Sequence, residues 1–535
     1  MANFVSRDWR GIWPATRAES HYGDRVVTCF AERPGSLHAM LVEAVARNPD
    51  GDALVCGGER LTYRALLART ARIAAGLQAH GVQPGDRVAL LLGNRIEFVL
   101  MLLAATRLGA ITVPLSVREQ APGRAYMLAH SGAVLVVHEP ELAPLLPTAH
   151  ETPALRARLA VGGADWTALE AAGAGPAPAA VAEEDCAAIL YTSGTTGRPK
   201  GAMLTHLGLV HSSMHYQIAM GLGAQDCTVA AVPLSHVTGL VALITTFLRC
   251  AGKLVIMPAF KATEFLPLAA RERMTHALMV PAMYNLCLLQ PDFAQHDLAR
   301  WRVGAYGGAP MPLATIEVLA RTVPALTLMN VYGATETTSP VTMVPAGCTA
   351  QRIATVGTTL ACAEVRIVDD AGQDVARDAL GEIWIKGPMT VPGYWDNPQA
   401  TVENISAGWW HSGDIGALDA DGYLRVVDRK KDMINRGGFK IYTIEVENAL
   451  YAHPAVQECA VVARPCPVLG ERVHAFVYLR DAVVTAEALA AHCRPLLSDY
   501  KVPDSYTLST TPLPRNANGK LVKRALRETL APYTR

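Results

Sequence analysis

The sequence has no surplus of either charge. Its 48 Lys and Arg residues equal its 48 Asp and Glu residues, and the formal net charge is zero. Proteins that bind nucleic acid without sequence preference usually carry a basic excess, so we expect no nucleic-acid partner. No apolar run approaches the ~18 residues of a membrane span, and the first ten residues lack the apolar region of a signal peptide. We therefore expect a cytoplasmic protein without an integral membrane segment.

Three patterns that carry chemistry in other proteins are also missing. The eleven cysteines are scattered and none forms C-x-x-C, which favours reduced thiols over a disulfide framework. No G-x-S-x-G is present, so a serine-hydrolase elbow is not supported. His206, His211 and His215 lie close together, but without the glutamate of a metalloprotease motif. We interpret these three histidines as packed side chains of a helix rather than as metal ligands.

The length of 535 residues predicts at least two domains, because one hydrophobic core rarely grows that large. Residues 36–120 alternate between two periodicities, which predict helices over 61–81 and 94–108 and strands over 87–92 and 111–115. Gly81 and Gly109 are typical residues for ending such helices. This βαβ order predicts a parallel sheet flanked by helices. Residues 347–423 are predicted to be rich in β-strand, and the chain beyond 434 to form a compact α+β domain.

One stretch of eleven residues, 191–201, combines glycines, hydroxyls and cations: Tyr-Thr-Ser-Gly-Thr-Thr-Gly-Arg-Pro-Lys-Gly. It follows an apolar segment, 187–190, predicted to be a strand, and we expect a helix from about residue 205. A glycine-rich loop there would present backbone N–H groups to a polyphosphate. A Walker loop is disfavoured, because Pro199 precedes Lys200 and Gly201 follows it. The predicted polyphosphate ligands are Thr192, Ser193, Gly194, Thr195, Thr196 and Lys200.

Further motifs follow in the sequence. They are Pro233-Leu-Ser-His236, the turn Gly307-Gly308-Ala309, Asn330-Val-Tyr-Gly-Ala-Thr-Glu336, Trp409-Trp-His-Ser-Gly-Asp-Ile415, the segment 427–441 and Leu513-Pro-Arg-Asn-Ala-Asn-Gly-Lys520. Together with the stretch 191–201, they resemble the motifs of the adenylate-forming superfamily, which includes acyl-CoA synthetases, luciferases and adenylation domains. The resemblance covers residues 36 to 527 approximately.

The resemblance implies a role for each motif residue. Its implied catalytic residues are Lys520, Glu336, Thr335 and His236: Glu336 holds Mg²⁺, Thr335 contacts the α-phosphate of ATP, and His236 lines the acyl side of the pocket. The implied nucleotide and CoA contacts beyond the polyphosphate loop are Gly308, Ala309, Asn330, Tyr332 beside the adenine, Asp414 and Arg429 on the ribose, Lys431 at a hinge, and Gly437 and Gly438 beside the CoA thiol. One departure is Thr443, where many relatives have proline.

The resemblance also implies the domain plan. A large α/β domain with βαβ-type sheets and a β-rich subdomain would span residues 1–428, a hinge residues 429–433, and a small mobile α+β domain residues 434–535. Rotation about the hinge would let one cleft serve two reactions in turn.

The implied reaction joins a carboxylic acid to coenzyme A. Attack of the carboxylate on the α-phosphate of ATP gives an acyl-adenylate and pyrophosphate, and the CoA thiol then displaces AMP. Val237 stands where amino-acid-activating relatives commonly have an aspartate, which disfavours an α-amino acid substrate. The surrounding segments are small and apolar, which favours a fatty or aryl acid. Transfer to a carrier-protein phosphopantetheine, a luciferase-like oxygenase and a non-catalytic nucleotide- or acyl-binding protein stay open as alternatives, as does a homodimer.

Overall fold

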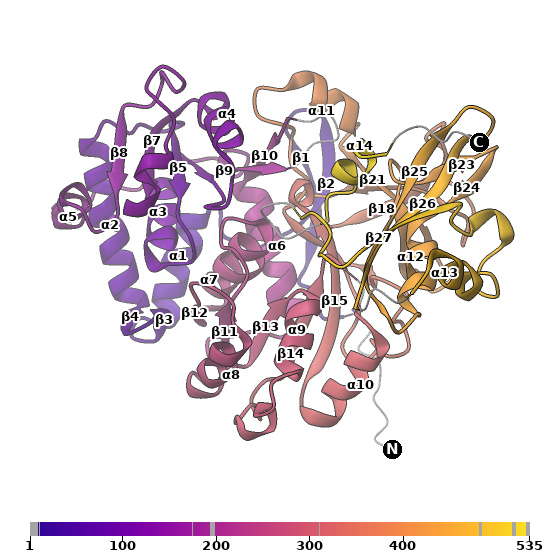
Figure 1. The fold of residues 1–535 in the computed structure, drawn as a ribbon. Helices are drawn as coiled ribbons and strands as arrows, with labels where there is room; N and C mark the ends of the chain where they lie inside the picture. The colour runs from indigo at the N-terminus through magenta and orange to yellow at the C-terminus, as the bar shows by residue number, and fades with distance from the viewer. Residues whose placement is uncertain are drawn as a thin grey trace. The chain divides into compact units, whose positions relative to one another are not determined.

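The computed structural model describes residues 9, 11–173, 175–192, 198–309, 311–480, 484–515 and 521–530. Contacts between Cα atoms divide the chain into two compact units. One comprises Met1–Val365, Trp384–His411 and Gly422–Leu424, and the other Arg366–Ile383, Ser412–Asp421 and Arg425–Arg535. Figure 1 shows the elements in chain order. No helix in the described part of the chain is both long enough and apolar enough to cross a membrane.

The first unit is built on two sheets that are parallel in their centres. The strands of the smaller sheet lie in the order β10 (Lys200–Thr205), β9 (Cys186–Thr192), β6 (Ile111–Pro114), β5 (Arg87–Leu91), β7 (Ala133–His138) and β8 (Ala157–Ala160). Only the pairing of β10 with β9 is antiparallel. These strands are nearly continuous apolar runs, as expected for a sheet covered on both faces.

The larger sheet has nine strands. Their order is β17 (Thr358–Thr359), β16 (Ser339–Met343), β15 (Thr327–Ala334), β14 (Val303–Gly307), β13 (His276–Met279), β11 (Cys227–Ala230), β12 (Lys253–Ile256), β3 (Asp52–Cys56) and β4 (Glu59–Thr62). From β15 to β3 the pairs are parallel, and the outer pairs are antiparallel. The predicted parallel sheet flanked by helices is confirmed.

Helices cover and connect these sheets. They are α1 (Leu37–Arg47), α2 (Tyr63–Ala79), α3 (Ile96–Arg107), α4 (Ala121–Ser131), α5 (Ala164–Ala171), α6 (His206–Ala219), α7 (Thr246–Cys250), α8 (Ala262–Arg271), α9 (Pro281–Leu288), α10 (Leu313–Thr322) and α11 (Pro398–Asn404). Helix α3 packs on β5 and β6 of the smaller sheet and on β3 of the larger sheet, so it connects the two sheets. Ten of its twelve residues are buried, so its apolar character continues around the whole helix.

The predicted helices and strands of residues 61–115 lie within a few residues of their expected bounds. Gly81 and Gly109 both adopt positive φ, at 77° and 70°, just after α2 and α3. The helix expected from about residue 205 is confirmed, but the stretch 191–201 is not a loop throughout, because strands include both of its ends. Residues 200–205 form β10, which pairs antiparallel with β9, and α6 starts after its N-cap Thr205. The strand β10 was missed because five of its six residues are buried, so its sequence shows no alternation of apolar and polar residues.

A five-stranded sheet follows in the chain, and the boundary between the two units runs through its strands. They are β18 (Glu364–Val368), β19 (Gly381–Lys386), β20 (Ile405–Ser406), β21 (Trp409–Leu418) and β22 (Leu424–Arg429). The predicted β-rich character of residues 347–423 is confirmed.

The remainder of the second unit is an α+β structure. Its sheet contains β24 (Phe439–Ile441), β23 (Ile434–Arg436), β26 (Gly470–Leu479) and β25 (Val456–Cys466), with β27 (Ser505–Ser509) parallel to β26. Helices α12 (Thr443–Tyr451), α13 (Ala486–Cys493) and α14 (Lys523–Glu528) accompany it. One apolar core joins the sheet to α12 and α13 through residues such as Val446, Val461 and Leu489.

Candidate active site

In the first unit, the carboxylate of Glu336, which follows β15, lies beside β9 and β10, the two strands at the ends of the predicted polyphosphate stretch. Thr192 ends β9 and pairs with Lys200, the first residue of β10. The Thr192 hydroxyl donates to Oε1 of Glu336 at 3.1 Å, although 144 residues separate them. Residues predicted from two distant motifs therefore meet. Ser193, Gly194, Thr195 and Thr196 of the same prediction lie outside the described residues.

Tyr394, which the sequence did not suggest, completes this group. Its hydroxyl also donates to Oε1 of Glu336, at 3.1 Å. The ammonium of Lys200 lies 5.2 Å from the centre of the Tyr394 ring, a cation–π distance. Burial, followed by the charge of Glu336, raises the pKa of the Tyr394 phenol, so the hydroxyl stays a donor. Tyr394 sits in a Pro-Gly-Tyr turn, and nothing in that turn linked it to Glu336.

Glu336 stands out because it is a buried carboxylate to which no cationic side chain of the described residues is paired. It is 9% exposed, and the described residues supply no ion pair to it. Both hydroxyl bonds from described residues fall on Oε1. A buried carboxylate is costly unless a cation or hydrogen bonds compensate it. Oxygen ligands of this kind suit Mg²⁺, which prefers one or two carboxylates together with phosphate oxygens. The residues present thus fit a magnesium ion.

The turn that carries Glu336 is strained and firmly held. Thr338 and Ser339 have positive φ values of 48° and 87°, which side chains rarely adopt. The Thr338 hydroxyl donates to the Met389 carbonyl at 2.7 Å, and the hydroxyls of Tyr216 and Ser339 lie 2.8 Å apart. Gly333 is required just before, because a Cβ there would lie 1.7 Å from the Ser339 carbonyl oxygen. These contacts fix the direction of the short 3-10 turn η4 (Thr335–Thr337), which carries Thr335 and Glu336.

The other predicted nucleotide residues lie at the carboxyl ends of β14 and β15, where parallel sheets commonly bind ligands. Gly308 and Ala309 follow β14 and are exposed, and Gly308 needs its positive φ of 77°. Tyr332 is half-buried near the end of β15. Asn330 is buried, and its amide donates to the Thr355 carbonyl at 3.1 Å, which anchors β15. Asn330 therefore supports this edge of the sheet through a backbone contact.

His236 lies in the loop between β11 and a π-helix, η2 (Thr238–Thr245). Its Nδ1 accepts from the Thr238 backbone N–H at 3.4 Å, which selects the tautomer protonated on Nε2. Asn94, a residue the sequence did not suggest, holds this loop. Its amide donates to the Val232 carbonyl at 3.0 Å and accepts from the Leu234 N–H at 2.9 Å. Single π-turns of this kind often occur at functional sites.

The three histidines of α6 are packed, as interpreted from the sequence. His211 accepts from the Phe30 N–H through Nε2 and donates from Nδ1 to the Leu207 carbonyl. Burial lowers the pKa of His211 to about 3 and that of His215 to about 4. Both rings are therefore neutral structural side chains.

The second unit pairs the two residues assigned to the ribose. Arg429 ends β22, and its Nε lies 2.7 Å from Oδ1 of Asp414 on the neighbouring strand β21. The Asp414 side chain is 6% exposed and that of Arg429 is 52% exposed. A carboxylate has two oxygens that can each accept a hydrogen bond, so Asp414 could accept from two sugar hydroxyls while Arg429 holds it in place.

The segment assigned to the hinge and to CoA is exposed. Lys431 is exposed, and its carbonyl accepts from Arg527 at 3.4 Å. Gly437 and Gly438 form the two-residue turn between β23 and β24, with φ values of 61° and 94°. Phe439 is exposed beside them and stacks on Tyr500 with ring centres 4.7 Å apart. Lys520 lies outside the described residues.

Thr443, the departure from the family pattern, closes a buried network. Its backbone N–H and its hydroxyl both donate to the Asp428 carboxylate, and the hydroxyl accepts from Lys523 at 2.7 Å. Proline could supply neither donor. Burial raises the pKa of Asp428, the residue directly before Arg429. The substitution thus creates a local anchor for the end of β22.

The buried Glu336 carboxylate beside Thr192 and Lys200, and the Asp414–Arg429 pair, are the groups that the resemblance to adenylate-forming enzymes assigns to ATP. Two family models agree: AMP-binding enzyme matches residues 41–395 and AMP-binding enzyme C-terminal domain matches residues 445–520. The chain belongs to this AMP-binding family, as one of its AMP-forming acid–CoA ligases. Such a ligase activates a carboxylic acid as an acyl-adenylate and then forms the CoA thioester.

Three similar proteins illustrate the range of the family. A feruloyl-CoA synthase of Amycolatopsis sp is 37% identical over 92% of this chain and 99% of its own. A long-chain-fatty-acid–CoA ligase of Mycobacterium tuberculosis is 32% identical over 88% and 93%. The structure of the o-succinylbenzoate–CoA synthetase of Bacillus subtilis with ATP and magnesium ion has a TM-score of 0.81 and 29% identity, covering 92% and 98%.

Proposed function

We propose that this chain activates an apolar aryl or fatty carboxylic acid with ATP and Mg²⁺ and transfers the acyl group to coenzyme A. The observation that carries the proposal is the buried Glu336 carboxylate, which faces Thr192 and Tyr394 at the base of the polyphosphate stretch. Relatives named as feruloyl-CoA, 4-coumarate–CoA and long-chain-fatty-acid–CoA ligases support this substrate class.

The segments around the proposed acyl site support an uncharged substrate body. Val237 is 6% exposed and Leu240 and Val341 are fully buried, so these three side chains supply apolar packing in the segments proposed to surround the acyl group. Residues 236–240, 281–284, 305–309 and 335–341 contain no Lys or Arg. A second carboxylate or a free ammonium group would lack a partner there, at a cost of several kcal/mol for a buried charge.

We assign the roles of the site residues from the described contacts and from the motifs that resemble those of the family. Glu336 would hold Mg²⁺, which would neutralise phosphate charge as the α-phosphate is attacked. Thr192 and Tyr394 orient the carboxylate through Oε1. Lys200, Ser193, Gly194, Thr195 and Thr196 would bind the leaving pyrophosphate, and Thr335 and Lys520 the reacting α-phosphate. Gly308, Ala309 and Tyr332 would contact the adenine, and Asp414 with Arg429 the ribose.

The second step would require a different arrangement of the small domain. We place the hinge at residues 429–433, between a large domain, 1–428, and a small domain, 434–535. Lys431 lies at its centre, and Gly437 and Gly438 would face the CoA thiol in the thioester-forming arrangement. Their exposed two-residue turn leaves the backbone accessible to a thin ligand such as pantetheine.

The decisive test measures AMP release from ATP in the presence of Mg²⁺ and CoA. The acid panel contains a hydroxycinnamic acid, a long-chain fatty acid, an α-amino acid and a dicarboxylic acid. Apolar acids should give the highest kcat/KM. Preference for the amino acid or the dicarboxylic acid would contradict the proposed substrate class. AMP release that does not depend on CoA with any acid would contradict coenzyme A as the acyl acceptor.

Glu336→Gln tests the metal assignment, with the exposed Glu317→Gln as control. Loss of the ligand should lower adenylation by about 100-fold or more, because a metal supplies several kcal/mol of charge stabilisation. Glu317→Gln should behave like the unaltered protein. Equal activity of the two variants would contradict the assignment of Mg²⁺ to Glu336.

A further inference from the structure

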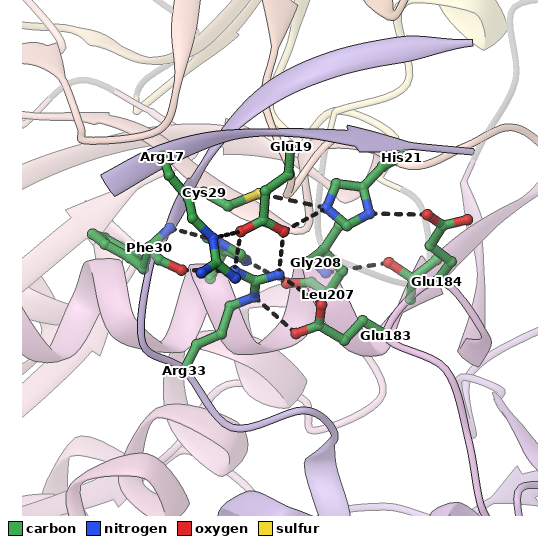
Figure 2. Close-up of polar contacts among 12 residues, drawn as sticks. Arg17, Glu19, His21, Cys29, Phe30, Arg33, Glu183, Glu184, Leu207 and Gly208 are labelled. Atoms are coloured by element: carbon green, nitrogen blue, oxygen red, sulfur yellow. Dashed lines mark hydrogen bonds and ion pairs between the residues drawn. The ribbon is translucent and has the colours of Figure 1, made fainter. Parts of the chain in front are cut away.

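A second polar cluster lies in the N-terminal hairpin and takes no part in the proposed reaction. Strands β1 (Thr16–His21) and β2 (Arg25–Phe30) pair antiparallel, with Arg17 opposite Cys29. Glu19 and His21 follow Arg17 at steps of two residues, so all these side chains share one face of the hairpin. Figure 2 shows them gathered above the start of α6, beside Glu183 and Glu184.

The ring of His21 lies between two carboxylates and a thiol. Its Nδ1 is 2.9 Å from Oε1 of Glu184, its Nε2 is 3.2 Å from Oε2 of Glu19, and the same Nε2 is 3.7 Å from Sγ of Cys29 (Figure 2). One ligand atom from each of Glu19, His21 and Cys29 lies within 4.8 Å of the others. His21 and Cys29 are buried and Glu19 is largely so.

These distances match the edges of a tetrahedral zinc site. Zinc binds imidazole nitrogen and carboxylate oxygen at about 2.0–2.2 Å and thiolate at about 2.3 Å. At tetrahedral angles these bond lengths put N and O about 3.3 Å apart, and N and S about 3.6 Å apart. The observed separations on Nε2 are 3.2 Å to oxygen and 3.7 Å to sulfur. Two of the three edges thus match a tetrahedral site, and the remaining pair, Glu19 and Cys29, lies within 4.8 Å.

The surroundings of the cluster have the features that support a metal ligand. A carboxylate on the far nitrogen of a ligating histidine fixes its tautomer and raises its basicity, and Glu184 occupies this position. Arg33 binds Glu19 and Glu183 with contacts of 2.6–2.9 Å. Arg33 and Arg17 thereby hold the Glu19 carboxylate in place beside the His21 ring.

The charges of the cluster also leave room for a cation. Three carboxylates, Glu19, Glu183 and Glu184, face two guanidinium groups, Arg17 and Arg33, so the carboxylates outnumber the guanidinium groups by one. A thiol that coordinates a metal ion loses its proton, so Cys29 would bind as a thiolate. The divalent ion and the thiolate together add one positive charge, which offsets that excess.

We propose that Glu19, His21 and Cys29 form a binding site for one divalent cation of the zinc type, with the fourth coordination position open to water. Thiolate and imidazole ligands favour zinc over magnesium or calcium. Binding releases the proton of the Cys29 thiol to solvent and fastens the hairpin to the residues that precede β9 through Glu184. The site is independent of the adenylation site, since none of its residues contacts Glu336, Thr192 or Tyr394 in the described structure.

Cobalt titration of the whole chain tests this proposal, after removal of metal with a chelator. One Co²⁺ per chain should produce a thiolate-to-cobalt absorption band in the near ultraviolet, and equimolar Zn²⁺ should abolish it. Cys29→Ser should lose the band, whereas Cys56→Ser, at a half-buried cysteine of β3, should keep it. Absence of the band in folded protein, or its persistence in Cys29→Ser, would overturn the proposal.

Glu184→Gln provides a second variant that leaves all three ligands in place. It should weaken Co²⁺ binding by about 10–100-fold, as loss of a hydrogen-bonded carboxylate behind a ligating histidine typically does. Unchanged affinity would argue against His21 as ligand. A proton on Nε2 of His21 would compete with the metal ion. If ¹⁵N NMR showed hydrogen on both ring nitrogens of His21 in the presence of equimolar Zn²⁺, the metal site would be refuted.

Discussion

The Tyr394 hydroxyl donates to Oε1 of Glu336 at 3.1 Å, across 58 residues of sequence. Tyr394→Phe should raise the Mg²⁺ concentration needed for half-maximal AMP release by about tenfold, because a hydrogen bond to a charged group contributes about 1.5–3 kcal/mol. The ring that faces Lys200 is kept in this variant. Thr192→Val, which removes the other hydroxyl on the same oxygen, should have a similar effect. If neither variant changed the Mg²⁺ dependence, the two hydrogen bonds to Oε1 would not orient Glu336 for metal binding.

Arg429 reaches Asp414 at 2.7 Å and should matter for the nucleotide rather than for the acid. Arg429→Gln should raise the KM for ATP by about tenfold, since it removes the cation beside a buried carboxylate and disturbs the proposed ribose contact. Initial rates against ATP and against the acid separate the two effects. Arg425→Gln, at an exposed position of the same strand, serves as control. A change confined to the KM for the acid would contradict the ribose assignment.

Lys520→Ala should divide the two half-reactions. Adenylation should be abolished, because the transferred α-phosphate loses a cation in its transition state. Thioester formation from synthetic acyl-adenylate and CoA should continue. Pyrophosphate release measures the first step, and thioester yield the second. Equal loss of both steps would refute this division of labour.

Lys431→Pro should affect the change between the two steps. Proline restricts the backbone at the proposed hinge, so each half-reaction should proceed in isolation while the complete reaction slows. Pre-steady-state accumulation of acyl-adenylate is the expected sign. Turnover equal to that of the unaltered protein would place the hinge elsewhere.

Glu19 should make the fold sensitive to acid. Its pKa lies at about 2, below the usual 4.5 of a glutamate, chiefly through its hydrogen bonds to Arg33. Because the folded state prefers the carboxylate, this stabilisation is complete above the unfolded-state pKa and is lost as pH falls from 4.5 towards 2. Urea unfolding across that window should show a smaller pH dependence for Glu19→Gln. Identical slopes would contradict the contribution of this ion pair.

The sequence predicted most of the fold because its local signals were strong. Helix α2 has an apolar face and α3 is a long apolar segment, and Gly81 and Gly109 follow them with positive φ as expected. Strand β10 was missed, since its buried residues show no alternation and the glycine-rich stretch before it suggested a loop. Asn94 and Tyr394 were missed for another reason: their effect depends on partners 58 to 163 residues away, and their own neighbours in sequence give no sign of it.

By itself the sequence determined the chemistry that is available: a polyphosphate stretch, a carboxylate for a cation, an aspartate and an arginine for a ribose, and the order in which they occur. Only the tertiary structure decided which groups meet. Thr192 ends β9 of the six-stranded sheet, whereas Glu336 follows β15 of the nine-stranded sheet. The two residues and Tyr394, which bridges to Ala202 of β10, lie close together because both sheets belong to one compact unit and a strained turn directs Glu336 inward. The hairpin register likewise brought Glu19, His21 and Cys29 together. Side-chain contacts between distant segments arise from packing, which no local pattern encodes.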